Sequence, residues 1–476
     1  MSYHNQYTIK VLDHVKVSPP AGSVPTISLP LTFFDIKWLL KPKNLPVRRL
    51  YLYEFPYPTH HFMQTVLPFL THSLSVTLQH FFPFASNLVC PPKPQKPYIH
   101  YVNGESSISF TVAEWSNANF NLLIADYPRD VKILHPFVSD LPSENTLEDG
   151  TVIVPLMSIQ VTVLPNSGLG LCFTYHHVNT DGKGFLHFLK SWSSICRTRG
   201  EYMTLLQKDS PFYNREIIKD PDAIELNFLK QWWNMETELK EDGPEGKILT
   251  YYDMVRATFV VTETHIRKLK QWLSLKCTEY ELRKLKMSTF VVSCALIWVC
   301  LVKSKEFLNN NDEDELYHWT FGIDCRKLLQ YPIPPTYFGN CLAPCYVPLN
   351  KRQLVGENGI FEAAKAIANK VSESKTGALT WFTERASSGK KIDYPNKYAV
   401  AGSPQLEGYK VDFGWGRPKK LEAVHIDEVD SIAISDSRDS EGGLEVGVAL
   451  RRTEMNNFSA ILGHHLKTLP GSLSNL

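Results

Sequence analysis

Apolar and polar residues alternate, or recur at helical spacing, along the first quarter of the chain. Arg48–Phe55 and Ser107–Glu114 have the composition of β-strands, and Phe62–Phe82 has the length and spacing of an amphipathic helix. This mixture of strand and helix patterns predicts a domain of the α/β class.

A hairpin followed by a helix is predicted in the next stretch of the chain. Two β-rich runs, Val152–Leu164 and Leu169–His177, are separated by a turn that contains proline and glycine, which indicates an antiparallel pair. Gly184–Arg197 then carries apolar and aromatic residues at helical spacing, and Asp181 stands near its expected N-cap. His177 is therefore expected on a strand-to-helix connection.

The second half of the chain has the same mixed character. The charged stretch Pro211–Lys247 is interrupted by proline and glycine, which favours a crossover between domains. We expect an N-terminal domain over residues 1–210, a linker over 211–247 and a C-terminal domain over 248–476. In the last of these, Asn309–Glu315 is an acidic surface loop by composition; the expected helices are Glu263–Lys276, Ser288–Lys303, Phe361–Ser374 and Glu454–Leu466, and the expected strands are Leu316–Ile323, Leu342–Pro348 and Ser431–Ile434.

Composition sets limits on the class of protein. A chain of 476 residues with 43% hydrophobic and 12% aromatic residues exceeds one ordinary domain and can bury large cores. With 50 basic and 49 acidic residues, its net charge of +1 gives no field that would attract nucleic acid or an anionic membrane. Met1–Pro20 lacks the apolar core of a signal peptide, and Ser288–Val302 is too short for a membrane span, so we expect a soluble cytoplasmic protein.

Neither a disulfide framework nor a metal site is expected. The nine cysteines are odd in number and include no Cys-x-x-Cys pair, which fits reduced thiols in a cytosol. His176, His177 and Asp181 are a weak metal candidate, because adjacent strand residues point to opposite faces and no further ligand cluster accompanies them.

Two short motifs carry the candidate chemistry. His177 stands four residues before Asp181 and Gly182, a spacing that could place a general base beside an orienting carboxylate. Taken alone, the same residues could be a buried histidine bonded to a backbone carbonyl and an ordinary helix cap. The second motif, Asp412–Gly416, combines two glycines with aromatic rings and a carboxylate; a structural corner is the favoured interpretation, because it offers no better base than His177.

Together, the two motifs resemble those of the plant acyl-CoA-dependent acyltransferases of the BAHD family. His177 to Gly182 is similar to the family's His-x-x-x-Asp-Gly motif. Condensation domains of peptide synthetases and chloramphenicol-type acetyltransferases share this histidine motif but lack the second signature. That second signature is matched letter for letter by Asp412, Phe413, Gly414, Trp415 and Gly416, and further similar segments are Leu29–Asp35, Tyr337–Cys341 and Val400–Pro404.

The resemblance implies a fold and a substrate class. It implies two similar-sized mixed α/β domains with a channel between them, in a monomer that has no permanently bound cofactor and uses acyl-CoA as co-substrate. Tyr337–Cys341 and the Leu-Thr-Phe-Phe-Asp start are similar to the branch that acylates sugar hydroxyls of anthocyanins and other flavonoid glycosides. Transfer to a phenylpropanoid or alkaloid alcohol or amine, and a non-catalytic binding relative, are the alternatives.

The resemblance also implies roles for individual residues. Neutral His177 would deprotonate the acceptor hydroxyl as it attacks the thioester, without an acyl-enzyme, and Ser403 or a nearby amide would stabilise the oxyanion. Asp181 could be a relay partner of the imidazole or a structural carboxylate. The resemblance implies the second role, with a salt bridge to Arg326.

The expected start of one helix provides candidates for binding CoA. Phosphates bind at helix N-termini and to lysines, and a helix is expected to begin near Ser288; the candidates are therefore Lys284, Lys286, Ser288 and Thr289. A solvated basic face with Ser288 as N-cap is an equal alternative. A malonyl donor needs a cation, which Lys183 could supply, whereas a hydroxycinnamoyl donor needs a flat apolar slot. Aromatic residues near the motif slightly favour the hydroxycinnamoyl donor.

Overall fold

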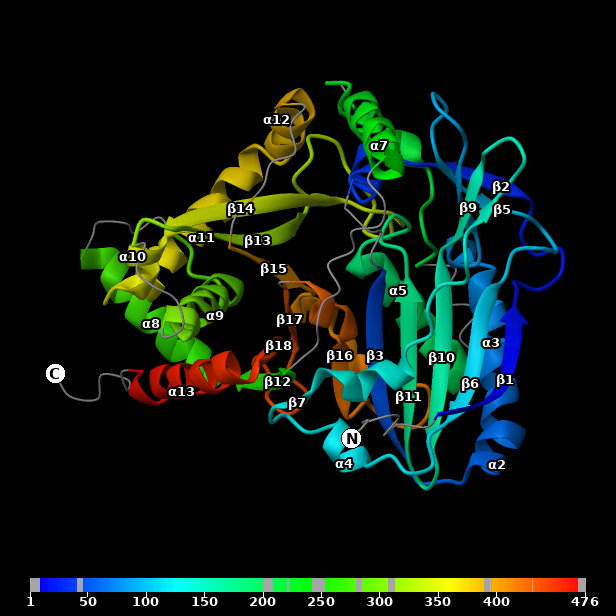
Figure 1. Ribbon diagram of the computed structural model, residues 1–476, viewed down its shortest axis with the longest axis horizontal. Helices are drawn as coiled ribbons and strands as arrows, with labels where there is room; N and C mark the ends of the chain where they lie inside the picture. Colours follow the sequence, from blue (N-terminus) through cyan, green and yellow to red (C-terminus); the bar gives the residue numbers. More distant parts are fainter. Residues whose placement is uncertain are drawn as a thin grey trace.

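The chain has a mixed α/β fold with three β-sheets, seen in a computed structural model (Figure 1). The structure describes residues 9–40, 46–199, 209–220, 222–241, 253–279, 285–306, 313–388, 394, 396–429 and 431–469. Two large sheets stand in the two halves of the molecule, one built chiefly by the first half of the chain and the other by the second (Figure 1).

The first large sheet has six strands. Helices α3 (Leu67–Leu78) and α5 (Gly182–Arg197) pack against each other beside it. Neighbouring strands are antiparallel, except for the parallel pair of β6 and β10. In spatial order the strands are β1 (Lys10–Val17), β6 (Ile108–Glu114), β10 (Met157–Leu164), β11 (Ser167–Tyr175), β3 (Val47–Phe55) and β16 (Lys420–Ala423).

A smaller sheet of five strands lies at the side of the first. Its order is β2 (Ile27–Pro30), β5 (Tyr98–Tyr101), β4 (Asn87–Cys90), β9 (Val152–Pro155) and β8 (Asn145–Thr146). Short helices complete this half of the molecule: α1 (Phe33–Ile36), α2 (Thr59–His61), a π-helical turn (Phe62–Val66), α4 (Phe120–Leu123) and 3₁₀ segments at Phe82–Phe84, Val131–Phe137 and Arg215–Ile217.

The second large sheet has seven strands and a helical layer. Helix α9 (Thr289–Glu306) lies at the centre of that layer, with α8 (Glu263–Glu279), α11 (Gly359–Thr376) and α13 (Arg452–Thr468) packed on it. The strand order is β14 (Leu342–Asn350), β13 (Leu316–Asp324), β15 (Lys397–Ala401), β17 (Ser431–Asp436), β18 (Leu444–Arg451), β12 (Met254–Val261) and β7 (Arg129–Asp130). Further elements are α7 (Ile224–Glu241), α10 (Lys351–Val355), α12 (Thr380–Ser388) and 3₁₀ segments at Pro404–Leu406, Gly408–Lys410 and Val424–Glu428.

Each large sheet takes one strand from the opposite half of the chain. Strand β16 pairs with β3 in the first sheet, and β7 pairs with β12 in the second (Figure 1). Buried ion pairs lie where the two sheets exchange strands. Glu422 pairs with Arg129 at 2.6 Å and with Arg256 at 2.8 Å, and Arg256 also pairs with Asp427 at 2.9 Å. Since both arginines and both carboxylates are almost fully buried, each charge depends on its partners.

Most predicted elements are present within a few residues of their expected ends, including the hairpin of β10 and β11 and the helices α8, α9, α11 and α13. Two predictions were wrong in detail. The helix expected over Phe62–Phe82 begins with a π-helical turn and ends at Leu78, and Pro68, which has no N–H to donate, follows that turn. The strand expected over Val152–Leu164 breaks after Pro155, and its two parts join different sheets.

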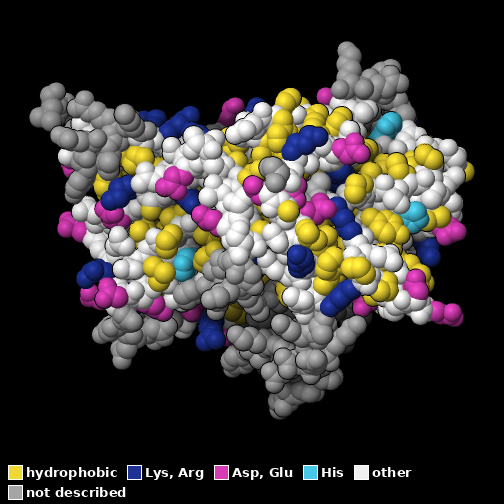
Figure 2. Space-filling model, turned by 90° about the horizontal axis from the view of Figure 1, so that it is seen from above, with side chains coloured by type: hydrophobic (Ala, Val, Ile, Leu, Met, Phe, Trp, Pro, Cys, Tyr) yellow, Lys and Arg dark blue, Asp and Glu magenta, His cyan; other side chains and the backbone are white. Residues whose placement is uncertain are grey.

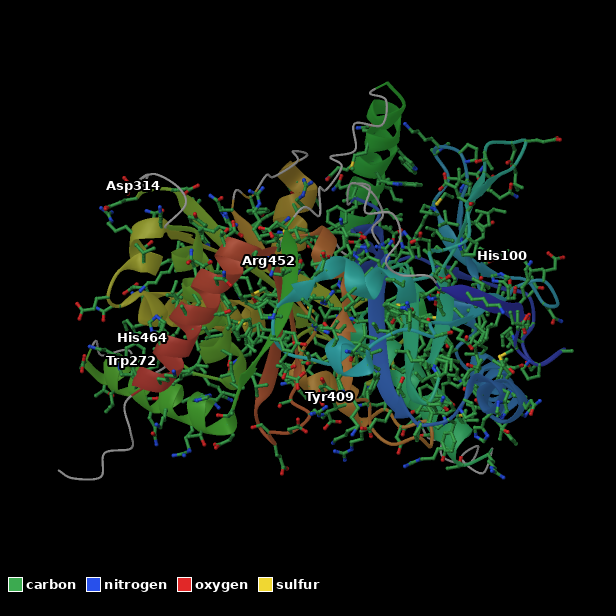
Figure 3. The ribbon with its side chains drawn as sticks, turned by 60° about the horizontal axis from the view of Figure 1, so that its bottom comes forward. His100, Trp272, Asp314, Tyr409, Arg452 and His464 are labelled. Carbon is green, nitrogen blue, oxygen red and sulfur yellow. The ribbon has the colours of Figure 1, made fainter. Side chains whose placement is uncertain are left out.

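The surface carries charges of both signs (Figure 2), and the cysteines are free thiols. Acidic and basic side chains are interspersed over the face shown in Figure 2, in keeping with the balanced charge. Asp314, from the predicted acidic loop, and His464 of α13 are exposed at the edge of the molecule (Figure 3). All nine cysteines lie in the described part of the chain and are thiols. Among the described helices, none is both long and apolar enough to cross a bilayer.

Candidate active site

His177 lies on the connection between strand β11 and helix α5, as predicted. Strand β11 ends at Tyr175, and the following His176 is buried. The Val178 N–H donates to Nδ1 of His176 at 3.2 Å, and burial lowers the pKa of His176 to about 4, so that this ring stays neutral at pH 7. His176 therefore supports the connection from inside the protein.

The ring of His177 faces a large cavity. It is half-buried and stacks on the indole of Trp38, with 3.4 Å between ring centres and 12° between planes. The backbone carbonyl of His177 accepts a hydrogen bond of 2.9 Å from the side-chain amide of Asn340. The imidazole thus has a fixed backbone beneath it and a flat aromatic neighbour beside it.

Asp181 is fully buried and holds the start of α5. Its Oδ1 accepts hydrogen bonds from the N–H groups of Lys183 at 3.1 Å and Gly184 at 3.2 Å, which is an N-cap. Its Oδ2 accepts the Cys341 N–H at 3.1 Å and pairs with Nη2 of Arg326 at 2.9 Å. The predicted ion pair between Asp181 and Arg326 is present. Because groups other than the His177 ring occupy both carboxylate oxygens, the geometry favours the structural interpretation over a relay.

A buried polar network beneath the connection was not predicted. Asn340 donates to the carbonyls of His177 and Val178 and to Oδ1 of Asp35 at 3.0 Å. Asp35 in turn pairs with Nη1 of Arg215 at 3.0 Å. Leu29–Asp35 and Tyr337–Cys341, which carried the resemblance to the family and to its flavonoid branch, therefore meet beneath His177.

Gly339 shows why the Tyr337–Cys341 segment contains a glycine. Its φ is +149°, and a Cβ at this position would lie 2.0 Å from Nη1 of Arg215. Arg326 also donates to the carbonyls of Tyr337 and Gly339, at 3.1 and 3.3 Å. One arginine thus connects this segment to Asp181. The signal in the sequence was the unusual Gly-Asn pair itself, but Asp35, His177 and Arg215, which contact this pair, are more than a hundred residues away.

The cavity has a volume of about 2280 Å³, well above the ~300–1,000 Å³ of a typical site for one small ligand. It brings together His177, Ser403 and three of the predicted CoA-binding residues, which are Lys286, Ser288 and Thr289. The fourth, Lys284, lies outside the described residues. The cavity is therefore large enough for two sizeable ligands, and His177 is part of its wall.

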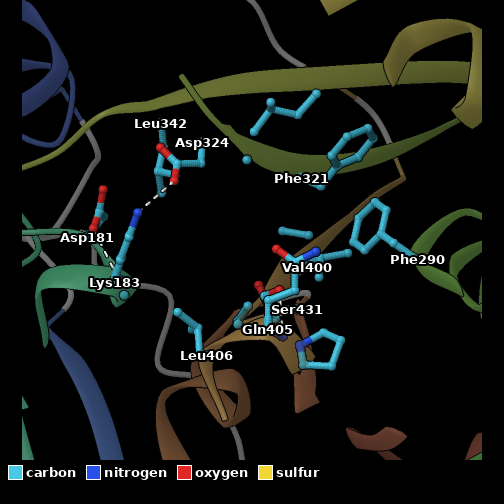
Figure 4. A pocket seen from close by; sticks show the side chains of 18 of the residues that line it. Asp181, Lys183, Phe290, Phe321, Asp324, Leu342, Val400, Gln405, Leu406 and Ser431 are labelled. Carbon is cyan, nitrogen blue, oxygen red and sulfur yellow. Dashed lines mark hydrogen bonds and ion pairs between the residues drawn. The ribbon is translucent and has the colours of Figure 1, made fainter. Parts of the chain in front are cut away.

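The N-terminus of α9 forms part of the cavity wall. The Ser288 hydroxyl accepts the Val291 N–H at 3.3 Å, so Ser288 caps the helix, and Nζ of Lys270 donates to the Thr289 hydroxyl at 2.9 Å. Phe290 lies in the same wall and packs edge-on against Phe321 of β13 (Figure 4). A cap does not exclude phosphate binding, because other N–H groups of the first turn still point out of the helix.

Ser403 and Lys183 stand on other parts of the wall. Ser403 follows β15, and its hydroxyl accepts the Gln405 N–H at 3.3 Å. The ammonium of Lys183 points to Asp324 and pairs with it at 3.6 Å (Figure 4). The charge of Lys183, considered above for a malonyl group, is therefore already balanced within the protein.

The Asp412–Gly416 motif is a tight corner that packs on the first sheet. Oδ1 of Asp412 accepts the N–H groups of Gly414 at 2.8 Å and Gly416 at 3.0 Å, and both glycines have positive φ, +104° and +89°. Phe413 packs edge-on against Trp192 of α5 at 4.9 Å, and Trp415 against Tyr53 at 5.6 Å. Among the described residues, the cavity lining includes none of these five.

The structure places a histidine in a cavity between two strand-exchanged halves, and comparison with known proteins gives the class and the family of the chain. A family model described as Transferase family matches residues 10–463. The chain belongs to this family, the BAHD acyltransferases. The chain is 38% identical over 470 residues to coumaroyl-CoA:anthocyanidin 3-O-glucoside-6''-O-coumaroyltransferase 1 of Arabidopsis thaliana, with 96% of this chain and 97% of the relative covered. It is 39% identical to malonyl-coenzyme A:anthocyanin 3-O-glucoside-6''-O-malonyltransferase of Dahlia pinnata, with 97% and 98% covered.

Solved structures of lower identity share the fold. Vinorine synthase superposes with a TM-score of 0.66 at 15% identity, covering 98% of this chain and 99% of that one. F. sporotrichioides TRI101, in complex with coenzyme A and T-2, superposes with a TM-score of 0.62 at 15% identity, covering 91% and 97%. At these identities the likeness concerns the two-domain architecture alone.

Proposed function

We propose that this protein transfers an acyl group, hydroxycinnamoyl or malonyl, from acyl-CoA to a sugar hydroxyl of an anthocyanin or another flavonoid glycoside. The observation that carries this proposal is one cavity of about 2280 Å³ that contains both the His177 ring and the N-terminus of α9. Its size suits two ligands at once, as direct transfer between them requires. The full-length relatives that carry out such transfers in Arabidopsis and Dahlia support the substrate class.

In the proposed mechanism, His177 acts as general base. The neutral imidazole removes the proton of the acceptor hydroxyl while the oxygen attacks the thioester carbonyl, and the C–O bond forms as the carbonyl π electrons move onto oxygen. The tetrahedral intermediate then re-forms the carbonyl and breaks the C–S bond, and the CoA thiolate takes up the proton. A positioned base contributes ~10²–10⁴-fold, whereas a thiol with a pKa near ~8.5 leaves readily.

Other residues position the reacting groups. Asp181 and Arg326, together with Asn340, fix the backbone on which the His177 ring is mounted. Ser403, or a backbone N–H beside it, would stabilise the oxyanion. Lys286 and Thr289 at the N-terminus of α9 would bind CoA phosphates, since helix N-termini favour anions. The Asp412–Gly416 corner would maintain the packing of α5 without touching substrate.

The proposal extends to organisation and location. We expect a cytoplasmic monomer whose ligands are acyl-CoA and a glycosylated flavonoid, without nucleic-acid or membrane partners. Acyl-CoA would enter from one side of the channel and the acceptor from the other. The domain division remains that given above, residues 1–210 and 248–476, with a linker that includes α7.

The test is direct assay of the purified protein. It would be incubated with malonyl-, acetyl-, coumaroyl- or caffeoyl-CoA and a panel of flavonoid glucosides, aglycones, phenylpropanoid alcohols and amines, with products detected by mass spectrometry. We expect ester products on sugar hydroxyls. Acylation of amines or of non-glycosylated alcohols alone would favour the second class of acceptor, and no product with any acceptor would favour a binding protein.

A further inference from the structure

Lys37 places an ammonium group beside the catalytic candidate. The residue follows helix α1 and lines the same cavity as His177. Its Nζ lies 5.0 Å from the centre of the Trp38 ring, and that ring stacks on His177 with 3.4 Å between centres. Nζ therefore lies no farther from the centre of the imidazole than these two distances added together. A short acyl chain whose carbonyl carbon reacts beside His177 can span that separation.

The protein does not fully satisfy this cation. Nζ donates one hydrogen bond of 2.6 Å to the carbonyl of Leu342, and the faces of Trp38 and Phe382 lie 5.0 and 5.4 Å away. Within the described part of the chain, no carboxylate forms an ion pair with it. An ammonium has three N–H donors, so two have no hydrogen-bond acceptor among the described residues and are available to a ligand.

The two aspartates whose charges act on Lys37 are already engaged. Asp181 pairs with Arg326, and Asp35 pairs with Arg215. Burial lowers the pKa of Lys37 to about 8, against the opposing effect of Cys325 and of these two aspartates, so the group is still mostly charged at pH 7. A cation partly withdrawn from water without a direct counter-ion is costly, and an anionic ligand would offset that cost.

We propose that Lys37 binds the free carboxylate of a short dicarboxylic acyl group carried by CoA, so that the enzyme prefers a malonyl-type donor over a hydroxycinnamoyl donor. This inference rests on the proposed function and selects one of its two donors. It reverses the slight preference for an aromatic donor that the sequence suggested. The aromatic residues near the motif pack on one another in the core: Tyr175 stacks on Phe185 and Phe188 on Trp192, and all four are buried.

Lys183 is the competing cation in the same wall. It follows the His-x-x-x-Asp-Gly motif directly, but its ammonium pairs with Asp324 at 3.6 Å and both side chains are more than 40% exposed (Figure 4). A cation that is solvated and already paired gains less from a carboxylate than one that is enclosed. Lys183 therefore provides a matched control for Lys37.

The experiment compares donors on one accepted flavonoid glucoside. kcat/KM would be measured with malonyl-CoA and with coumaroyl-CoA for the wild type, Lys37→Met, Lys37→Arg and Lys183→Met, each checked for folding by thermal melting. We expect the wild type to favour malonyl-CoA and Lys37→Met to lose about tenfold or more in kcat/KM for that donor alone, since a charge-assisted contact is lost. Lys37→Arg should retain part of the preference, and Lys183→Met should leave the ratio between donors unchanged.

Calorimetric titration with the two CoA esters gives a second measurement that does not need turnover. Tighter binding of malonyl-CoA, lost in Lys37→Met, would support the inference. A wild type that prefers coumaroyl-CoA, an equal loss for both donors in Lys37→Met, or a preference removed by Lys183→Met would overturn it and leave the acyltransferase proposal standing. The absence of transfer from every donor would instead contradict the proposed function.

Discussion

The His177–Asp181 connection and the Asp412–Gly416 corner are equally distinctive in the sequence, yet they are built in opposite ways. The connection rests on buried charges: Asp181 on Arg326, and Asn340 on Asp35. The corner rests on aromatic packing and on one carboxylate that bonds its own backbone. Only the connection contributes to the cavity lining among the described residues. A distinctive motif can thus serve chemistry or shape, and its surroundings decide which.

The largest effect is expected at the ring itself. His177→Ala should lower kcat by about 10²–10⁴-fold, the usual contribution of a positioned base. Its melting temperature should stay near that of the wild type, because the imidazole is half-buried at a cavity wall. Steady-state kinetics and thermal unfolding check this. Retained turnover would show that another group is the base, and a large fall in melting temperature would make the ring structural.

Removing the carboxylate beneath the connection should act on stability first. Asp181→Ala removes the buried carboxylate that pairs with Arg326, leaves that arginine only the partly exposed Asp324 as an ion-pair partner, and removes the cap of α5, so the free energy of unfolding should fall by about 3 kcal/mol. Asp181→Asn should cost less, since its amide oxygen in the Oδ1 position can still accept the Lys183 and Gly184 N–H groups that cap α5. Urea unfolding measures both variants. An unchanged stability in Asp181→Ala would contradict the structural role of the ion pair.

Stability of the connection should also depend on pH. The folded-state pKa of His176 is lowered to about 4 from an ordinary 6.5, so between these values the unfolded chain binds more protons. Stability should therefore be complete above pH 6.5 and fall by about 3 kcal/mol as the pH is lowered to 4. In His176→Asn, urea unfolding across this range should show a correspondingly smaller slope. An identical slope would mean that other groups account for the acid sensitivity.

The smallest effect is expected at the corner. Asp412→Ala removes two hydrogen bonds to backbone N–H groups at a partly exposed site, which should cost about 1 kcal/mol and leave kcat unchanged in folded protein. Thermal melting and steady-state kinetics on the same preparation would test both parts. A loss of kcat comparable to that of His177→Ala would place the corner in the chemistry and remove the contrast between the two motifs.

Local signals in the sequence were sufficient for most of the fold. Apolar periodicity located α5, α8, α9, α11 and α13, because each buries one face or its whole surface against a sheet. The N-cap predicted at Asp181 is also present. Capping could be predicted because it depends only on residues within three positions of the cap. The resemblance to a family, rather than spacing, led to Arg326 as its partner.

Long-range pairings were beyond the reach of such signals. Nothing near Asp35 indicates Arg215 or Asn340, and the stacking of Trp38 on His177 joins residues that are far apart in the sequence. The short strand β16, only four residues long, gave no periodic pattern and was not predicted, although it completes the first sheet. Residues of the cavity wall that belong to local motifs could therefore be predicted, and contacts made only by the folding of the chain could not.

The exchanged strands β7 and β16 have a mechanical consequence. Because each half supplies an edge to the sheet of the other, and because Glu422 and Arg256 are locked together at that junction, the halves cannot swing apart without exposing buried charge. This junction favours one fixed arrangement of the two halves over a hinge between them. We therefore expect the cavity to keep its shape when ligands bind, so that the residues of its wall decide which ligands fit.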